Sequence, residues 1–435
     1  MKRTRCPAIL LLLIASVAGE AGAQVASPTA RSGGVANSFT ARARGYEAPF
    51  WNPANLGLSE RPPLSLGLAG VSGYLNNNSL SYSQISDLYG VFLDDQAKSD
   101  LLAEIREGNP DRLFELDFDV GGSVLGISIG RFAAGLSMIA AGNMKLSSDA
   151  VELVLFGNDG EDGSGADLDL EGTDGKAWWM SGAYLAYAQP FTISALDHLG
   201  MRFSVGAGVN FGVTNGYIRV ADRGSRFTQE PLALAAEAEI IRSTDADAGR
   251  YWGIDLGLAM EWQKLVASLS LQNALGDVRW NVDDFELHLY GIQSDFGGSS
   301  TTDRTFAFSD LSLEEQDRLR GLFAQSDPPK RLRLGAMYQV TPKLSLSADY
   351  RDLIGGTLRS RWDHTLSAGG EFVPLAAFPL RAGLATDFSQ LAVTAGIGAY
   401  LKAIHIDLAI GDWILLEGDG IVASLSISLW PTDWE

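Results

Sequence analysis

The chain has 435 residues, a formal net charge of −20 at pH 7, and 49 glycines spread along its whole length. This acidity argues against a nucleic-acid partner, which would favour a basic patch. After the first twenty residues no stretch approaches 18 uninterrupted apolar residues, so membrane-spanning helices are excluded, whereas membrane-spanning strands are not.

Residues 1–23 have the three parts of a secretory signal peptide. A basic start precedes an apolar core over residues 8–18, and Ala21, Gly22 and Ala23 form a small-residue cleavage site. The apolar core is too short to cross a bilayer as a helix, which needs about 20 residues. We therefore expect export and cleavage, with the alternative that the segment is kept as an anchor.

The only cysteine, Cys6, precedes the apolar core and leaves with the signal peptide. The mature chain would then have no disulfide and no cysteine metal site. Export, acidity and the lack of cysteine suit a protein of the Gram-negative cell envelope, and we expect no cofactor.

Residues 24–62 show no strand pattern and contain "APFWNPANLGL" at 48–58. An aromatic side chain and two asparagines thus precede the first regular element. The residues of this stretch that we single out are Phe50, Trp51, Asn52, Pro53, Ala54 and Asn55.

Residues 251–262, "YWGIDLGLAMEW", indicate the fold class because apolar side chains occupy every second position. Side chains alternate between the two faces of a strand, so one face is wholly apolar, with Trp252 and Trp262 at its ends. Ten residues of tilted strand span roughly 25 Å, the height of the apolar band of an outer-membrane barrel between its aromatic girdles. The opposite face carries small and charged residues, as a lumen would.

The same alternation recurs along the chain and predicts an all-β fold, a transmembrane antiparallel β-barrel over residues 63–430 followed by a tail at 431–435. A soluble β-sandwich also alternates, but its strands are usually shorter. We expect an even number of strands, fourteen, at 63–73, 115–129, 131–146, 177–189, 200–212, 250–262, 264–275, 330–340, 343–351, 364–372, 379–388, 390–399, 401–411 and 420–430.

If the last strand ends in the periplasm, the long loops fall on the outer side, at 74–114, 147–176, 213–249 and 276–329. Two of these loops contain helix signals, at 94–107 and 312–325. We expect these helices to cover the barrel mouth or to act as a ligand-collecting lid. Residues 229–241 are either a further strand or a loop helix.

Two motifs suggest chemistry only weakly. The loop 157–175 contains Asp167, Asp169 and Glu171, a weak calcium candidate because position twelve of a calcium loop would be Trp178 instead of Glu. A G-x-S-x-G pattern at 126–130 lies within a predicted strand, where a nucleophile elbow would need a strand-to-helix turn. The four histidines show no metal-ligand spacing. We therefore expect neither an enzyme nor a metal site.

The predicted lumen carries charges of both signs, which favours ion-pair networks over an open ion pore. The residues that the register places in the lumen are Arg202, Asp255, Glu261, Arg331, Arg333, Asp349, Arg351, Glu371, Arg381, Asp387, His405 and Asp407. Because side chains alone fill only barrels of about eight strands, some segment must occupy this lumen, and residues 24–62 are the obvious candidate.

Residues 33–58 resemble the N-terminal hatch of the FadL-type outer-membrane transporters and their PorV-like relatives. The match is Trp51-Asn52-Pro53-Ala54, followed by Leu56, just before the first strand. The resemblance implies a barrel plugged by its N-terminal segment, through which hydrophobic small molecules such as fatty acids pass inward and leave laterally through a strand kink.

The implied partners are a hydrophobic ligand, outer-membrane lipids and lipopolysaccharide. PorV-like relatives instead serve secretion, so the alternative is a scaffold barrel that binds secreted partner proteins and transports nothing.

Overall fold

The computed structural model describes residues 29–80, 93–107, 113–163, 167–229, 232–295, 298–358, 364–388, 390–414 and 420–430. The predicted signal peptide and the tail at 431–435 lie outside these ranges. Among the described residues, no helix combines the length and the apolar character needed to cross a bilayer.

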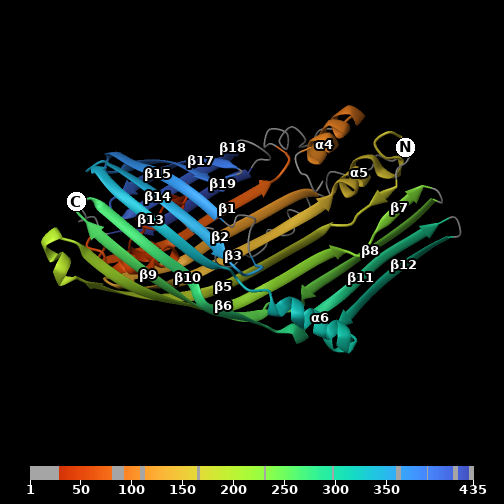
Figure 1. Ribbon diagram of the computed structural model, residues 1–435, viewed down its shortest axis with the longest axis horizontal. Coiled ribbons are helices and arrows are strands. Elements are labelled where there is room, and N and C mark those ends of the chain that lie inside the picture. The colour runs from red at the N-terminus through yellow and green to blue at the C-terminus, as the bar shows by residue number, and fades with distance from the viewer. Residues whose placement is uncertain are drawn as a thin grey trace.

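Fourteen antiparallel strands form a barrel that closes where the first strand pairs with the last. This confirms the predicted number of strands and their antiparallel order. The strands, which run obliquely along the barrel (Figure 1), are β1 (Leu64–Asn77), β2 (Leu113–Ile129), β3 (Phe132–Ser147), β5 (Asp174–Phe191), β6 (Arg202–Asp222), β9 (Gly249–Trp262), β10 (Leu265–Trp280), β13 (Lys330–Thr341), β14 (Leu344–Ile354), β15 (His364–Leu375), β16 (Phe378–Thr386), β17 (Leu391–Leu401), β18 (Ile404–Ile414) and β19 (Gly420–Leu429).

Strand β9 shows how the alternating sequence decides the two faces of the wall. Tyr251 and Asp255 are buried on the inner side, at 7% and 5% exposure. Trp252, Leu256 and Trp262 on the other parity are 43%, 48% and 39% exposed and point away from the lumen. The aromatic residues expected at the two ends of the apolar face therefore lie on the outer surface.

An apolar outer surface of this kind runs round the barrel. Large apolar side chains are exposed on every barrel strand, while the opposite parity carries buried serine, aspartate, arginine and tyrosine. Exposure of this much apolar surface is costly in water and favourable in a bilayer. The protein therefore has the architecture of a Gram-negative outer-membrane barrel.

Five further strands extend the sheet beyond one end of the barrel (Figure 1), and here the predicted loops need correction. Within 229–241, expected as either a strand or a loop helix, the described residues are strand: residue 229 ends one strand, and residues 232–241 lie in the next. The expected loop at 276–329 contains a hairpin. Its second strand is exposed along almost all its length, so its sequence lacks the alternation of apolar residues that a buried face produces. These strands are β4 (Leu168–Asp169), β7 (Arg226–Gln229), β8 (Leu232–Ser243), β11 (Phe285–Asp295) and β12 (Gly298–Ala307).

Both predicted helices are present, α4 (Asp95–Glu107) and α6 (Leu313–Ala324), and the Ser312 side chain caps the second as its spacing predicts. A third helix, α5 (Ser148–Phe156), was not expected. All three lie at the end of the barrel that carries the extra strands (Figure 1). The short 3-10 turns η3 (Gly157–Asp159), η4 (Ser194–Leu199), η5 (Val282–Asp284) and η6 (Phe308–Asp310) complete the connections.

Helix α6 is fixed to the extended sheet by an aromatic cluster. Phe323 of the helix packs on Phe285 with ring centroids 4.3 Å apart, and on Tyr217 and Trp280 at 5.2 Å each. The Trp280 indole also donates a hydrogen bond to the Ser326 carbonyl. The helix is therefore held against the extended sheet as part of a packed core.

Replacing Leu256 by Arg tests whether the exposed apolar surface faces lipid. A charge near the bilayer midplane costs about 2–4 kcal/mol, so we expect the free energy of unfolding in phospholipid vesicles to fall by that amount. The matched control is Leu313→Arg, at a residue that is 78% exposed on α6, where we expect a change within about 0.5 kcal/mol. Equal effects at both positions would contradict a lipid-facing β9.

The plugged lumen as a candidate functional site

Residues 29–58, here called the plug segment, lie inside the barrel. The segment consists of a helical turn, α2 (Ala30–Gly33), and two 3-10 turns, η1 (Gly45–Phe50) and η2 (Pro53–Gly57), joined by irregular chain. Nearly all of its side chains are buried, and it contacts strands round the circumference of the barrel. A wide lumen is thus filled by the backbone and side chains of this segment.

Glycines on the barrel wall make room for the plug segment. A Cβ atom on Gly206 of β6 would collide with the backbone of Pro53 and Ala54, and one on Gly257 of β9 would collide with the Asn52 side chain. On the opposite wall, a Cβ on Gly383 would strike the backbone of the plug at residues 35–36. The wall and the plug segment therefore fit too closely for either to change alone.

Trp51 is 1% exposed and lies between an aromatic ring and a cation. Its ring meets Phe39 edge-on, with centroids 5.6 Å apart, and the Arg333 guanidinium of β13 lies 4.3 Å from the indole centroid. Cation–π contacts are strongest when both groups are removed from water, as here. Trp51 thus joins the plug segment to the barrel wall.

The two asparagines of the W-N-P-A-N stretch bond both within the plug segment and to the wall. Asn52 caps η2 by accepting from the Ala54 amide at 2.9 Å, while its side-chain amide donates to the Leu258 carbonyl of β9 at 2.8 Å. Asn55 donates to the carbonyls of Thr40 and Ala43 at 2.8 and 3.0 Å. Both asparagines attach the plug segment to the wall, since the Ser268 hydroxyl of β10 donates to Asn55 at 3.1 Å, and Asn55 also holds the turns of the segment together.

Two further wall residues hold the plug backbone. The Asp349 carboxylate of β14 accepts from the amides of Phe39 and Thr40 at 2.9 and 2.7 Å. The Gln272 amide of β10 donates to the Phe50 carbonyl at 2.9 Å. An irregular segment makes few hydrogen bonds within its own backbone. When it is buried, polar groups of the wall must therefore bond to its backbone N–H and C=O groups.

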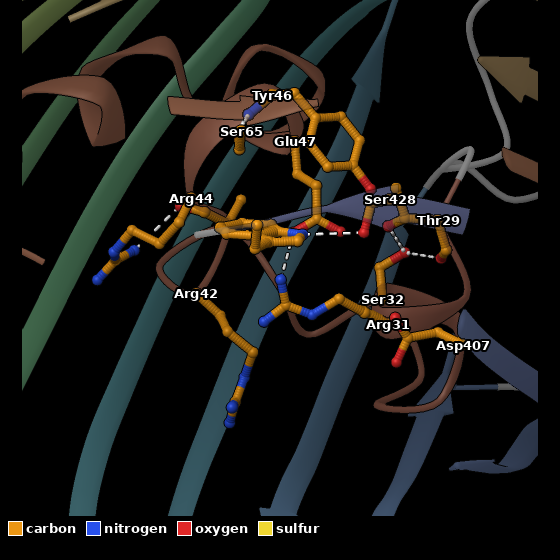
Figure 2. A network of polar contacts seen from close by, with 12 residues as sticks. Thr29, Arg31, Ser32, Arg42, Arg44, Tyr46, Glu47, Ser65, Asp407 and Ser428 are labelled. Atoms are coloured by element: carbon orange, nitrogen blue, oxygen red, sulfur yellow. Dashed lines mark hydrogen bonds and ion pairs between the residues drawn. The ribbon is translucent and has the colours of Figure 1, made fainter. Parts of the chain in front are cut away.

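An ionic network joins the plug segment to strands β15 to β18. Arg31 donates to Glu47 within the plug segment at 2.9 Å (Figure 2). Arg381 of the wall donates to Glu371 and to Asp407, each at 2.6 Å. Arg42 of the plug segment contacts Glu371 at 3.3 Å and so connects the two groups.

Glu47 is fully buried, and one of its two carboxylate oxygens, Oε1, has no hydrogen-bond partner in the described part of the chain. Burial raises the pKa of Glu47 to about 7, against the opposing effect of Arg31, and the negative charge of Asp407 raises it further. The carboxyl group of Glu47 therefore changes its protonation state near neutral pH.

The residues predicted to face the lumen occupy three kinds of position. Most of those on the inner parity reach the plug segment or one another, and Arg202 and Asp387 lie at strand ends. Buried are Asp255, Arg331, Arg333, Asp349, Arg381 and Asp407; half-buried are Glu261, Arg351, Glu371, His405 and Asp387; exposed is Arg202. Of the six singled out in the plug segment, Trp51, Asn52, Pro53, Ala54 and Asn55 are buried and Phe50 is half-buried.

Sequence reasoning missed the charged residues of the plug segment itself, Arg31, Arg42, Arg44 and Glu47. The sequence contained a signal for them. Charged residues in a segment that is predicted to fill a lumen lined by positive and negative side chains must find partners there. What the sequence did not reveal was which partner each one takes.

The residues of the two weaker motifs make ordinary contacts in the described part of the chain. Asp169 lies 3.4 Å from Arg226, and the described residues contain no group of three or more His, Cys, Asp or Glu side chains able to hold a metal. Ser128 of the G-x-S-x-G pattern lies in β2, bonds to the Ser65 hydroxyl at 2.8 Å, and is followed by a hairpin turn into β3.

The ladder between β1 and β2 is interrupted, although its register is the same on both sides of the interruption. The ladder pairs Gly67 with Gly126 and next pairs Gly70 with Ser123, so two residues on each strand, 68–69 and 124–125, are left out of it. At this level the register shifts between β1 and β19 and between β2 and β3.

This interruption of the ladder, here called the wall gap, adjoins an apolar cavity on the outer surface and is backed by the plug segment. The cavity measures about 270 Å³ and includes Val71, Val124 and Met138 in its lining. On the lumen side the Tyr46 ring lies against Gly67, where a Cβ would collide with it. Tyr46 therefore stands directly behind the wall gap.

Comparison with known proteins finds likeness only among solved structures, since no family model and no curated protein matches the chain. A FadL homologue of Pseudomonas aeruginosa is 15% identical over 94% of this chain and 99% of its own, with a TM-score of 0.48. The toluene transporter TbuX of Ralstonia pickettii is 15% identical over 92% and 98%, at 0.45. The toluene transporter TodX of P. putida is 12% identical over the same shares, at 0.47.

Gly206→Ala tests how tightly the plug segment fits. The added methyl meets backbone that cannot rotate away, and overpacking of about 1–3 kcal/mol should unseat the segment part of the time. We expect trypsin to cleave after Arg42 and Arg44, which are 5% and 7% exposed, several-fold faster than in the wild type.

Gly208→Ala is the matched control, two residues along the same strand. Its Cβ would have no neighbour closer than 3.6 Å, so the rate of cleavage at the two arginines should not change. Mass spectrometry of the two sites measures both variants, and an unchanged rate in Gly206→Ala would contradict the tight fit.

Proposed function

We propose that the protein takes up hydrophobic small molecules, such as fatty acids or aromatic solutes, passively across the outer membrane through a plugged barrel. The observation that carries the proposal is the wall gap, where the interrupted ladder between β1 and β2 adjoins an apolar outer cavity beside the plugged lumen. In this proposal the two strands part there, and a molecule that prefers lipid to water leaves the lumen between them.

The plug segment explains why the proposed route does not run straight along the barrel axis. It closes the lumen toward the periplasm with buried contacts on many strands, so a molecule that enters from the outer mouth is stopped above it. In this proposal Trp51, Asn52 and Pro53 shape the hatch, and Tyr46 is the group that must move aside for the molecule to reach the wall gap.

The names of the solved structures record toluene transport and FadL homology for those proteins. For this chain they show a similar fold only. The chain's own wall gap and plug segment are what make a hydrophobic cargo the best fit here.

A scaffold for secreted proteins is the second candidate, and the extended sheet favours it. Within the described residues β12 pairs with β11 alone, and its outward edge is exposed. An exposed strand edge can accept a strand of another protein. Recovery of a secreted protein in stoichiometric amount with the purified barrel, together with no hydrophobic ligand in the lumen, would favour this candidate over transport.

A disulfide across the rim of the wall gap tests the lateral route. Gly70 and Ser123 are register partners, a spacing that suits a disulfide. In Gly70→Cys with Ser123→Cys we expect uptake of a long-chain fatty acid and of toluene into whole cells to fall under oxidising conditions and to recover on reduction.

The control pair is Ser72→Cys with Ser424→Cys. These residues are register partners on the other side of β1, with hydroxyls 2.7 Å apart, and their disulfide leaves the wall gap open. Equal uptake by the oxidised and reduced forms of the first pair would rule out the lateral route.

A further inference from the structure

The seat of Glu47 is unusual because the carboxylate is held by a single cation. Arg31 donates to Oε2 at 2.9 Å, and the Thr29 side chain offsets a small part of the effect of burial on the pKa, while Oε1 has no hydrogen bond of good geometry in the described part of the chain. Glu371, by contrast, receives bonds from both Arg381 and Arg42. A fully buried carboxylate with one unsatisfied oxygen is costly as an anion and much less so when it carries a proton.

Arg31 has limited freedom to compensate. Its guanidinium lies 5.8 Å from the centroid of the Phe39 ring and 5.1 Å from that of Trp430, so it is held between two aromatic rings (Figure 2 shows its contact with Glu47). It cannot turn to satisfy the second oxygen of Glu47 without leaving these rings.

Tyr46 of the plug segment, Arg381 of β16 and Asp407 of β18 interact electrostatically with Glu47. Further charged and titratable groups surround its partner Arg31 and include both signs. These groups are Arg42 of the plug segment, Glu371 of β15, Tyr400 of β17 and His405 of β18.

We propose that Glu47 is a proton-operated latch on the plug segment: protonated, it lets the segment stay seated in the lumen, and ionised, it loosens the segment. The neighbouring residue, Tyr46, stands behind the wall gap, so loosening at Glu47 moves the group that closes the gap. This latch goes beyond the proposed uptake function, because it concerns how the lumen is opened and not what passes through it.

The direction of the pH effect follows from linkage. Glu47 has a pKa of about 7 in the seated segment and about 4.5 when exposed to water, so the seated state binds the proton more tightly. The stabilisation is complete below pH 4.5 and is lost as the pH rises through about 7. The plug segment is therefore seated more firmly in acid and released more often in base.

Hydrogen exchange of residues 29–58 in the full-length protein, reconstituted in phospholipid vesicles, measures the seating directly. After correction for the intrinsic exchange rates, we expect protection in the wild type to fall about 30-fold between about pH 5.5 and pH 8.5, the factor that the two pKa values imply. The peptide 250–262 of the barrel wall serves as an internal reference, and its protection should not change.

Glu47→Gln removes the titrating proton and keeps the shape of the side chain, so its protection should be independent of pH. Glu371→Gln is the matched control, a carboxylate of the same network that is bonded by two arginines. It should lower protection at every pH and keep the 30-fold dependence. The latch is overturned if the wild type shows no fall with rising pH, or if Glu47→Gln retains that fall.

This experiment separates the latch from the proposed function because it uses no transported ligand. A protein that takes up neither fatty acid nor toluene would still show Glu47-dependent protection if the latch is correct.

Discussion

The width of a fourteen-strand barrel is the constraint on which the rest of the structure depends. Side chains fill a barrel of about eight strands, so here the chain must supply a further segment to the lumen. That segment has little secondary structure of its own, and its backbone groups must find partners on the wall. Asp349 and Gln272 provide them, and Gly206 and Gly257 provide the space. The small and polar inner face of each strand follows from this need.

A filled lumen also changes the meaning of the charges in it. Arg381 between Glu371 and Asp407 shows a paired network that lines no ion path, because the plug segment covers it. In the proposed uptake, the wall gap between β1 and β2 is the way from the lumen to the lipid. The position of Tyr46 behind it then makes the plug segment a seal for two proposed routes, one toward the periplasm and one into the membrane.

Much of the fold could be predicted from local sequence, because strand faces alternate with a period of two and Trp252, Leu256 and Trp262 mark the lipid side directly. The W-N-P-A stretch likewise indicated a segment inside the lumen. The hairpin β11–β12 escaped prediction because it lies outside the bilayer, where Thr301 and Thr302 face water on both sides. The wall gap was not predicted for another reason. An irregular pairing depends on which residues of two strands lie opposite each other, and the sequence of one strand does not show this. The same holds for Glu47, because the wall charges that act on it, Arg381 and Asp407, are more than 300 residues away in the chain.

The central claim is that residues 29–58 close an otherwise open barrel. Ion conductance across a planar bilayer tests it most directly, with the full chain compared with a chain lacking residues 24–58 whose barrel is shown by circular dichroism to be folded. The account predicts that the full chain conducts almost no current and that the shortened chain forms a large, steadily open channel. Equal conductance in the two proteins would contradict it.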